Sequence, residues 1–241
     1  MKMKIKLTGK NLQDIRALLP AFQLEEDDKE FEIIICHGGD GALLGAEREF
    51  PGVPKLPIRD DATAPTCPLH SLEERLGAFM AGKLPVSTLP KLSASWNGGT
   101  FCGINDIFLH NKLDCGALRF NVFIDGEPYA SEVLGDGAGV STVHGSTAYY
   151  RSITRSIFKT GLGVAFSNAT AEISHLVIPE NSVIEFEILR GPGLLIADNS
   201  PVREIPAGEK ITIALSEEKA QIIGLEEFMC PGCRRIRHHW A

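Results

Sequence analysis

The segment EIIICHGGDGALLG, residues 32–45, constrains the fold of this chain more than any other stretch. An apolar run is followed by a glycine-rich turn and then by an amphipathic stretch. Short apolar runs bounded by glycine are typical of buried strands, and the pattern after the turn is typical of a helix. The segment therefore predicts a strand–turn–helix unit, in which the helix N-terminus and unpaired backbone N–H groups favour an anion such as phosphate.

Asp40 lies inside this turn, among Gly38, Gly39 and Gly41. A carboxylate repels a phosphate unless it holds a cation or accepts a proton, so we predict that Asp40 acts on Mg²⁺ or on a hydroxyl nucleophile. The alternative is a tight strand–helix turn in which the aspartate caps the helix, and so short a pattern often occurs by chance. The segment matches neither the GxGxxG dinucleotide-binding pattern nor a P-loop, because no Gly-Lys-Ser/Thr follows.

The apolar pattern changes near residue 88. Before that point, predicted strands alternate with predicted helices, which indicates a parallel sheet covered by helices. After it, short alternating segments are separated by Gly, Pro and Asn-Gly turns, which indicates antiparallel sheet. The strands of the first part are expected at 3–8, 31–37 and 53–58, and its helices at 11–22, 41–50 and 70–82. We expect an α/β domain at 1–88, a β-rich domain at 89–229 and a tail at 230–241.

Charge and hydropathy exclude several classes of protein. The chain has 241 residues and a formal net charge of −7, so it has no basic face for a phosphate backbone and nucleic acid is not an expected partner. No apolar run approaches the roughly 20 residues of a membrane helix. The N-terminal stretch lacks the apolar region of a secretory signal, so we expect a cytoplasmic protein. Four cysteines in apolar or mixed segments are expected as buried thiols: Cys36, Cys67, Cys102 and Cys115.

A second candidate site lies in VLGDGAGVSTVHGSTAYYRSI, residues 133–153. A strand is expected to end near Thr142, and Ser146 is a candidate cap for a helix beginning at Thr147. Hydroxyls and free amides would then crowd at one point and bind a polar ligand. Tyr149 adds an aromatic face. The alternative is a capped helix with a core tyrosine, which fits Tyr150 better.

Two turn carboxylates accompany this region. Asp136, in the GDG segment, is able to accept hydrogen bonds from ribose hydroxyls. Asn105 and Asp106 stand where an alternating strand begins. An asparagine amide pairs with the amino group and N7 of adenine, and an aspartate accepts from ribose hydroxyls. The alternative for this pair is a simple strand-entry turn.

The order of these motifs resembles that of the NAD kinase family over most of the chain. GGDG is followed about 65 residues later by an Asn-acid pair, and then by IDGE, GDG and GSTAY. GGDG alone is shared with phosphofructokinases and lipid kinases, whereas GSTAY together with the Asn-acid pair is similar to NAD kinases. The resemblance implies a Rossmann-like α/β domain followed by a β-rich domain. It implies transfer of a phosphoryl group from ATP or polyphosphate to the 2′-hydroxyl of the adenosine ribose of NAD, with Mg²⁺ or Mn²⁺, in a homodimer or homotetramer.

The resemblance also implies roles for particular residues. Asp40 would act on the 2′-hydroxyl as a base or polarising group, and the backbone of the three turn glycines would hold phosphates. The NAD-binding residues would be Asn105, Asp106, Asp136, Ser146, Thr147, Ala148, Tyr149 and Ser152, with His144 as a further candidate contact to the substrate.

Several positions depart from the family pattern. Ala42 replaces the usual Thr, His144 replaces a small residue, and NAT at 168–170 replaces the usual PHS. The usual DGQ is replaced at 198–200, and RDDATAPTC at 59–67 replaces the usual GRLGF. These departures leave two alternatives open: a non-catalytic nucleotide-binding or regulatory protein on the same fold, and a kinase with a lipid or sugar substrate.

The chain ends in CPGCRRIRHHWA, residues 230–241. Cys230 and Cys233 have the spacing of half a zinc knuckle, and His238 and His239 are candidates to complete a tetrahedral site. Adjacent histidines in an extended chain point apart, so the tail would have to reverse sharply to use all four ligands. We therefore expect a surface tail, no metal held by protein ligands alone, and substoichiometric zinc or none in the purified protein.

Overall fold

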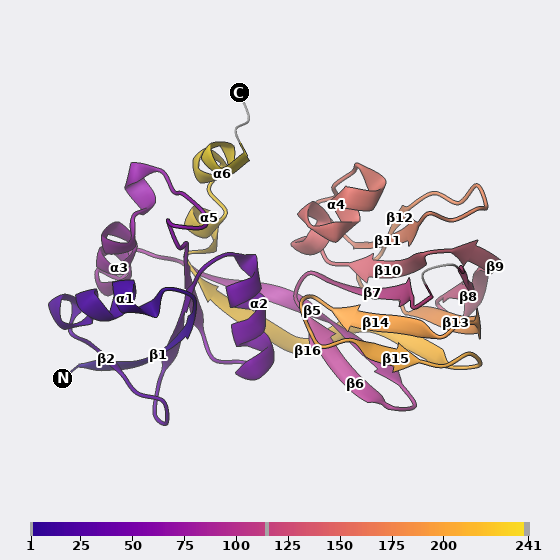
Figure 1. Cartoon of the computed structure of the whole chain (residues 1–241), viewed down its shortest axis with the longest axis horizontal. Coiled ribbons are helices and arrows are strands. Elements are labelled where there is room, and N and C mark those ends of the chain that lie inside the picture. The colour runs from indigo at the N-terminus through magenta and orange to yellow at the C-terminus, as the bar shows by residue number, and fades with distance from the viewer. Residues whose placement is uncertain (1, 114–115, 239–241) are drawn as a thin grey trace. The chain divides into compact units, whose positions relative to one another are not determined.

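The computed structural model describes the backbone of residues 2–113 and 116–238 (Figure 1). Two compact units are present: Met1–Leu89 with Lys219–Ala241, and Pro90–Glu218. The first expected boundary, at residue 88, differs from this division by one residue. Residues 219–229 differ more, because they belong to the first unit and not to the β-rich one.

The first unit is built on a parallel sheet with the strand order β2-β1-β3-β4-β16, in which only the C-terminal end of β16 takes part. Its strands are β1 (Met3–Gly9), β2 (Leu24–Glu26), β3 (Ile33–His37), β4 (Lys55–Ile58) and β16 (Lys210–Ile223). Its helices are α1 (Leu12–Leu18), η1 (Leu19–Phe22), α2 (Asp40–Glu49), η2 (Pro68–His70), α3 (Leu72–Met80), α5 (Leu225–Phe228) and α6 (Pro231–His238). Every expected strand and helix of this unit is confirmed.

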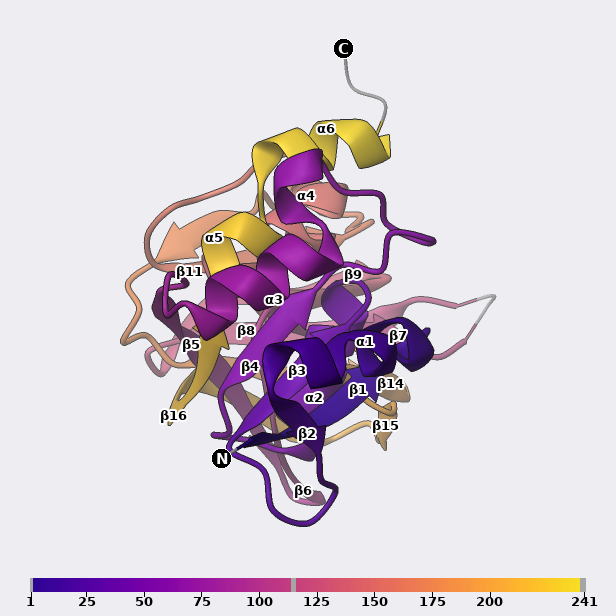
Figure 2. The same ribbon diagram turned by 90° about the vertical axis from the view of Figure 1, so that its left-hand side faces the viewer.

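Helices cover both faces of this parallel sheet (Figure 2). On one face, Ile15 of α1 and Leu76 of α3 are fully buried in a cluster with Ile5, Ile35 and Leu56 of the strands. On the other face, α2 packs against residues of β3 that point the opposite way. Both faces of the strands are therefore apolar, which explains the continuous run at 33–36.

The second unit is an antiparallel β-sandwich. One sheet contains β16, β13, β8 and β9, with β5 and β6 paired alongside, and the other has the order β12-β11-β10-β7-β14-β15. Apolar side chains from both sheets form its core. The strands are β5 (Val86–Trp96), β6 (Gly99–Gly103), β7 (Asp106–Asn111), β8 (Leu118–Ile124), β9 (Glu127–Gly135), β10 (Gly137–Ser141), β11 (Leu162–Ser167), β12 (Leu176–Ile178), β13 (Ile184–Arg190), β14 (Gly193–Ala197) and β15 (Arg203–Ile205). Two short helices, η3 (Gly145–Thr147) and α4 (Tyr149–Thr154), follow β10.

The expected fold class, an α/β domain followed by a β-rich domain, is confirmed. Among the described residues, no helix has the length and apolar character needed to cross a bilayer.

Candidate functional site

The strand order of the first unit creates a binding position between β1 and β3. The chain moves outward from β1 to β2 and then returns to β3 and β4, so the connections from β1 and β3 run in opposite directions. Ligands of open parallel sheets bind at such a reversal, beyond the carboxyl ends of the strands. A pocket of ≈ 530 Å³ lies there, and it is lined by Gly9, Lys10, His37, Gly38, Gly39, Gly41, Ala42, Thr63 and Ala64.

Two glycines allow the backbone to form this pocket. Gly9 has a φ of 115°, and a Cβ there would lie 2.0 Å from the carbonyl oxygen of His37. Gly38 has a φ of 144°, which L side chains rarely adopt. Three glycines of the turn line the pocket together with Ala42 of the first turn of α2. The backbone and the positive end of the α2 dipole are therefore available to an anion.

Asp40 is the first residue of α2, and Gly39 occupies the cap position without a side-chain cap. The alternative in which Asp40 caps the helix is therefore wrong. Its side chain is 59% exposed, and its Oδ1 accepts a hydrogen bond of 3.1 Å from Nη2 of Arg59. Asp40 is not among the residues that line the ≈ 530 Å³ pocket.

Arg59, which the sequence analysis missed, is held rigidly. Its side chain is 7% exposed, and its guanidinium carbon lies 3.7 Å from the centroid of the Phe228 ring. Nη2 also donates to the carbonyl oxygen of Phe228, at 3.4 Å. The available signal was its position directly after β4, at the same sheet edge as the glycine-rich turn. Arg59 thereby restricts the rotamers of Asp40.

In the second unit, Asp198 holds the turn that carries Asn105 and Asp106. Its carboxylate accepts backbone N–H bonds from Ile104 (2.7 Å), Asn105 (2.7 Å) and Asp106 (3.2 Å). Oδ1 of Asn105 is buried and has no hydrogen-bond partner among the described residues. Buried polar atoms are normally paired, so this oxygen is available to a donor on a ligand.

Asp106 is 8% exposed, and in the antiparallel pairing of β7 with β10 its register partner is Ser141. Burial raises the pKa of Asp106 to about 7, and the neighbouring Asp198 carboxyl adds to the shift. Burial likewise raises the pKa of Asp198, against the effect of the three N–H groups that favour its ionised form. Near neutral pH Asp106 therefore exists partly as a carboxylic acid, which donates a hydrogen bond as well as accepting one.

The GSTAY segment packs against this turn through its backbone. A Cβ on Gly145 would lie 2.0 Å from the carbonyl oxygen of Asn105, so only glycine fits. Thr142 reinforces the contact, because its N–H donates to the Asn105 carbonyl (2.9 Å) and its hydroxyl to that of Ile104 (2.8 Å). Asn105, Asp106 and Gly145 are thus brought together.

The expected helix start at Thr147 is wrong. The structure has the 3₁₀ helix η3 first, and α4 begins at Tyr149 with Ala148 as its cap and no side-chain cap. Ser146 is 1% exposed, and its hydroxyl interacts with the carbonyl oxygens of Val143 (2.7 Å) and Phe158 (3.2 Å). Its side chain therefore stabilises the turn. Ser152 is exposed and donates to the carbonyl of Ala148 (3.3 Å).

Aromatic side chains lie beside this turn. Tyr149 is 36% exposed and makes an edge contact with Phe108 (4.7 Å between centroids), and it lies 5.5 Å from the ring of His110. Burial lowers the pKa of His110. Tyr150 is fully buried, as the alternative interpretation of this tyrosine predicted. A planar ligand ring therefore has an aromatic surface available at Tyr149.

Asp136 lies away from the turn that carries Asn105, Asp106 and Gly145, whereas His144 directly precedes Gly145. Asp136 precedes β10, at the end opposite to Ser141, and its carboxylate accepts a bond of 2.6 Å from the amide nitrogen of Asn168. Asn168 belongs to the NAT segment at 168–170, which replaces the usual PHS of the family pattern. The first residue of this departing segment is thus the hydrogen-bond donor to Asp136. His144 is half-buried and precedes η3.

Comparisons with known proteins connect these features to one family. No family model matches the chain. An NAD kinase of Hahella chejuensis is 34% identical over 152 residues, which are 55% of this chain and 49% of that protein, so the alignment spans about half of the relative. An NAD kinase of Saccharolobus islandicus is 25% identical over 236 residues, which are 92% of this chain and 93% of that protein.

Solved structures share the fold. Yeast NADH kinase complexed with NADH superposes with a TM-score of 0.79 at 15% identity, covering 92% of this chain and 83% of that chain. An NAD kinase from Archaeoglobus fulgidus in complex with ATP has a TM-score of 0.75 at 18% identity, covering 95% and 96%.

Proposed function

The chain belongs to the NAD kinase family, and from that premise we propose that it transfers a phosphoryl group from ATP or polyphosphate to the 2′-hydroxyl of the adenosine ribose of NAD, giving NADP. The observation that carries the proposal is the position of Asp40. It places a carboxylate at the N-terminus of α2, next to a glycine-lined pocket at the strand reversal. A carboxylate at this position repels a bound phosphate unless it holds a cation or accepts a proton, which favours a catalytic role over phosphate binding alone.

In this mechanism Asp40 accepts the proton of the ribose 2′-hydroxyl while the hydroxyl oxygen bonds to the terminal phosphorus of ATP or polyphosphate. The bond from that phosphorus to the bridging oxygen breaks, and ADP or the shortened polyphosphate leaves. Arg59 holds the carboxylate in one orientation, so less conformational freedom is lost at the transition state. Backbone N–H groups of Gly38, Gly39 and Gly41, with the α2 dipole, bind the phosphates.

Asp40, together with the nucleotide phosphates, would hold a divalent cation, Mg²⁺ or Mn²⁺, which would supply positive charge beside the transferred group. The donor set fits, because the exposed Asp40 carboxylate is an oxygen ligand of the kind these ions prefer. The Archaeoglobus complex supports ATP as the donor.

NAD recognition is assigned to the second unit. The unpaired Oδ1 of Asn105 accepts from a nucleotide donor, Asp106 binds a hydroxyl, and Tyr149 lies against a ring. Thr147 and Ala148 contribute backbone groups to the proposed NAD site. Further candidate contacts to NAD are Asp136, His144 and Ser152. A homodimer or homotetramer stays a proposal that rests on the resemblance of the sequence motifs, and the free thiols of the described cysteines suit the cytoplasm.

The decisive experiment incubates the purified protein with NAD, ATP and Mg²⁺ and measures NADP. We expect NADP to form with wild type, and Asp40→Asn to lower turnover by about 10²–10⁴ while NAD binding is retained. Asp14→Asn is the matched control, because Asp14 is the acid in the first turn of α1, and it should leave turnover unchanged. Near-normal turnover of the Asp40 variant would contradict the assignment. Phosphorylation of a lipid or sugar acceptor in place of NAD would select the rival kinase function.

A further inference from the structure

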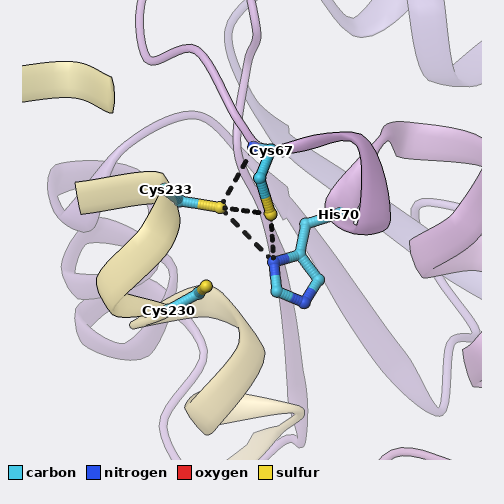
Figure 3. Close-up of side chains that lie close together, drawn as sticks. All are labelled: Cys67, His70, Cys230 and Cys233. Carbon is cyan, nitrogen blue, oxygen red and sulfur yellow. Dashed lines mark hydrogen bonds between the residues drawn. The ribbon is translucent and has the colours of Figure 1, made fainter. Parts of the chain in front are cut away.

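Four metal-binding side chains converge in the first unit, from segments far apart in the sequence (Figure 3). Cys67 precedes the short helix η2 and His70 is its last residue, while Cys230 precedes α6 and Cys233 lies in its first turn. One ligand atom from each residue lies within 4.8 Å of the other three. Cys233 is 1% exposed, and the other three side chains are half-buried.

The distances match a tetrahedral metal site. Nδ1 of His70 lies 3.3 Å from Sγ of Cys67 and 3.3 Å from Sγ of Cys233, and the two sulfurs are 3.5 Å apart. Zinc bonds of about 2.3 Å to sulfur and 2.0 Å to nitrogen give ligand-to-ligand separations of roughly 3.5–3.8 Å in a tetrahedron. These three atoms therefore need to move by only a few tenths of an ångström to bind one ion.

The two segments have the same local pattern. Cys-Pro-Leu-His at 67–70 and Cys-Pro-Gly-Cys at 230–233 each place two ligands with two residues between them, on a turn begun by proline. Backbone N–H groups of Gly232 and Cys233 donate to the Cys230 sulfur, and the N–H of Cys67 donates to the Cys233 sulfur at 3.3 Å. Such bonds orient and stabilise thiolate ligands.

The charge of a loaded site has a nearby partner. Three thiolates and one Zn²⁺ carry a net charge of −1. The Arg75 side chain is 4% exposed, interacts electrostatically with Cys233, and is fixed by a bond of 3.0 Å from Nη2 to the carbonyl of Gly224. Arg75 also lies 3.6 Å from a carboxylate oxygen of Glu227, so its positive charge is shared between that acid and the loaded site.

We propose that Cys67, His70, Cys230 and Cys233 bind one structural Zn²⁺ ion, which fastens α6 to the connection between β4 and α3. Each coordinating thiol releases its proton to solvent on binding. Three cysteines and one histidine in a tetrahedron are a common structural zinc set, whereas iron–sulfur clusters commonly use four cysteines. The inference does not depend on the proposed kinase activity.

This site has a consequence for the pocket, because both belong to the same connection. Thr63 and Ala64 line the ≈ 530 Å³ pocket. Asp60 fixes the start of the connection by accepting bonds from the Asn11 amide (2.9 Å) and the Thr63 hydroxyl (2.9 Å). The zinc site fixes its other end, so a long segment without regular strands is held at both ends.

The proposal replaces the expectation of a zinc-free tail. That expectation considered only His238 and His239 as partners of the cysteine pair; His239 lies outside the described residues, and the side chain of His238 is not described. The missed signal was the repeated Cys-Pro-x-Cys/His spacing, which also separates Cys67 from the other apolar cysteines.

The test measures zinc in the full chain purified without a histidine tag or added metal, under reducing conditions. We expect one zinc per chain by elemental analysis, and at least about a tenfold loss of zinc in Cys67→Ser and in Cys233→Ser. Cys102→Ser is the matched control, because Cys102 is a half-buried thiol in β6 of the other unit. The Cys102→Ser protein should contain as much zinc as the wild type.

A second measurement does not require the variants to fold. Wild type stripped of zinc is titrated with Co²⁺, which should give the visible bands of tetrahedral cobalt bound to thiolates. Hydrogen exchange of residues 60–71 and 230–235 should be faster in the stripped protein and slow again on zinc addition. Wild type without zinc that shows no tetrahedral cobalt spectrum would overturn the proposal, as would full zinc retention in both serine variants or a Cys67–Cys233 disulfide in the native protein.

Discussion

Asp106→Asn is expected to stabilise the second unit at neutral and alkaline pH. The variant keeps the shape of the side chain and removes its charge. In the folded protein burial raises the pKa of Asp106 to about 7, whereas an unfolded chain has an aspartate pKa of about 3.9. Between these values the unfolded chain loses its proton and the folded protein keeps it, so the free energy of unfolding falls as pH rises.

The size of the effect follows from the shift. Each unit of difference between the folded and unfolded pKa of Asp106 corresponds to about 1.36 kcal/mol. The resulting loss in the free energy of unfolding therefore approaches roughly 4 kcal/mol above pH 7. Between pH 5 and pH 8 the free energy of unfolding of the wild type should fall by about 2.5 kcal/mol more than that of the variant. Asp198 has a raised pKa too, and its carboxyl contributes to the shift of Asp106.

The assay is urea unfolding at pH 5 and pH 8, followed by the fluorescence of Trp96, which packs against the core of the same unit. The chain has two tryptophans, so Trp240→Phe in both proteins leaves Trp96 as the reporter. Asp14→Asn serves as the control for an exposed helix aspartate. If wild type and Asp106→Asn differed by the same free energy at both pH values, to within about 0.5 kcal/mol, the buried-carboxyl explanation would be refuted.

Three further predictions concern the same turn. Asn105→Ala should weaken NAD binding by about tenfold and ATP binding much less, since it removes the unpaired Oδ1; equal weakening in calorimetric titrations would make the residue structural. Gly145→Ala should lower the free energy of unfolding by about 3 kcal/mol, because its Cβ would meet the Asn105 carbonyl, and an unchanged denaturation midpoint would argue against that contact. His144→Thr should alter the pH dependence of the KM for NAD between about pH 6 and 8, and a superimposable profile would show that the imidazole does not contact the substrate.

The longer strands and helices before residue 88 were predictable because each of them has its own hydrophobic period. β2 escaped prediction because its three residues, Leu24–Glu26, are too few to show a period. The end of β16 was assigned to the wrong unit for a different reason. An apolar strand does not indicate which sheet it joins, and the pairing of Ile222 with Lys55 joins residues far apart in the chain.

The candidate site was predictable where a short motif carries the chemistry and not where distant residues complete it. Asp40 stands out among glycines, whereas Arg59 is an ordinary arginine until the fold brings it to 3.1 Å from that carboxylate. Asp198 likewise belongs to a segment that departs from the family pattern at its next two positions, yet its carboxylate organises the turn before β7. Tertiary packing determines long-range partners of this kind, and the local hydrophobic periodicity of the sequence does not reveal them.

The GSTAY segment also identifies a site through residues that cannot themselves select the ligand. Gly145 has no side chain, and the Ser146 hydroxyl is bonded to backbone carbonyls. In the proposed site the side chains at this turn that can discriminate include Tyr149 and the pair at the start of β7. There the Asn105 oxygen accepts a hydrogen bond, and Asp106 donates one when it is protonated. A donor beside an acceptor matches a nucleotide edge or a ribose diol, and the donor form is favoured as pH falls below about 7. Selectivity of this turn for its nucleotide should therefore change with pH, even though no histidine takes part in that pair.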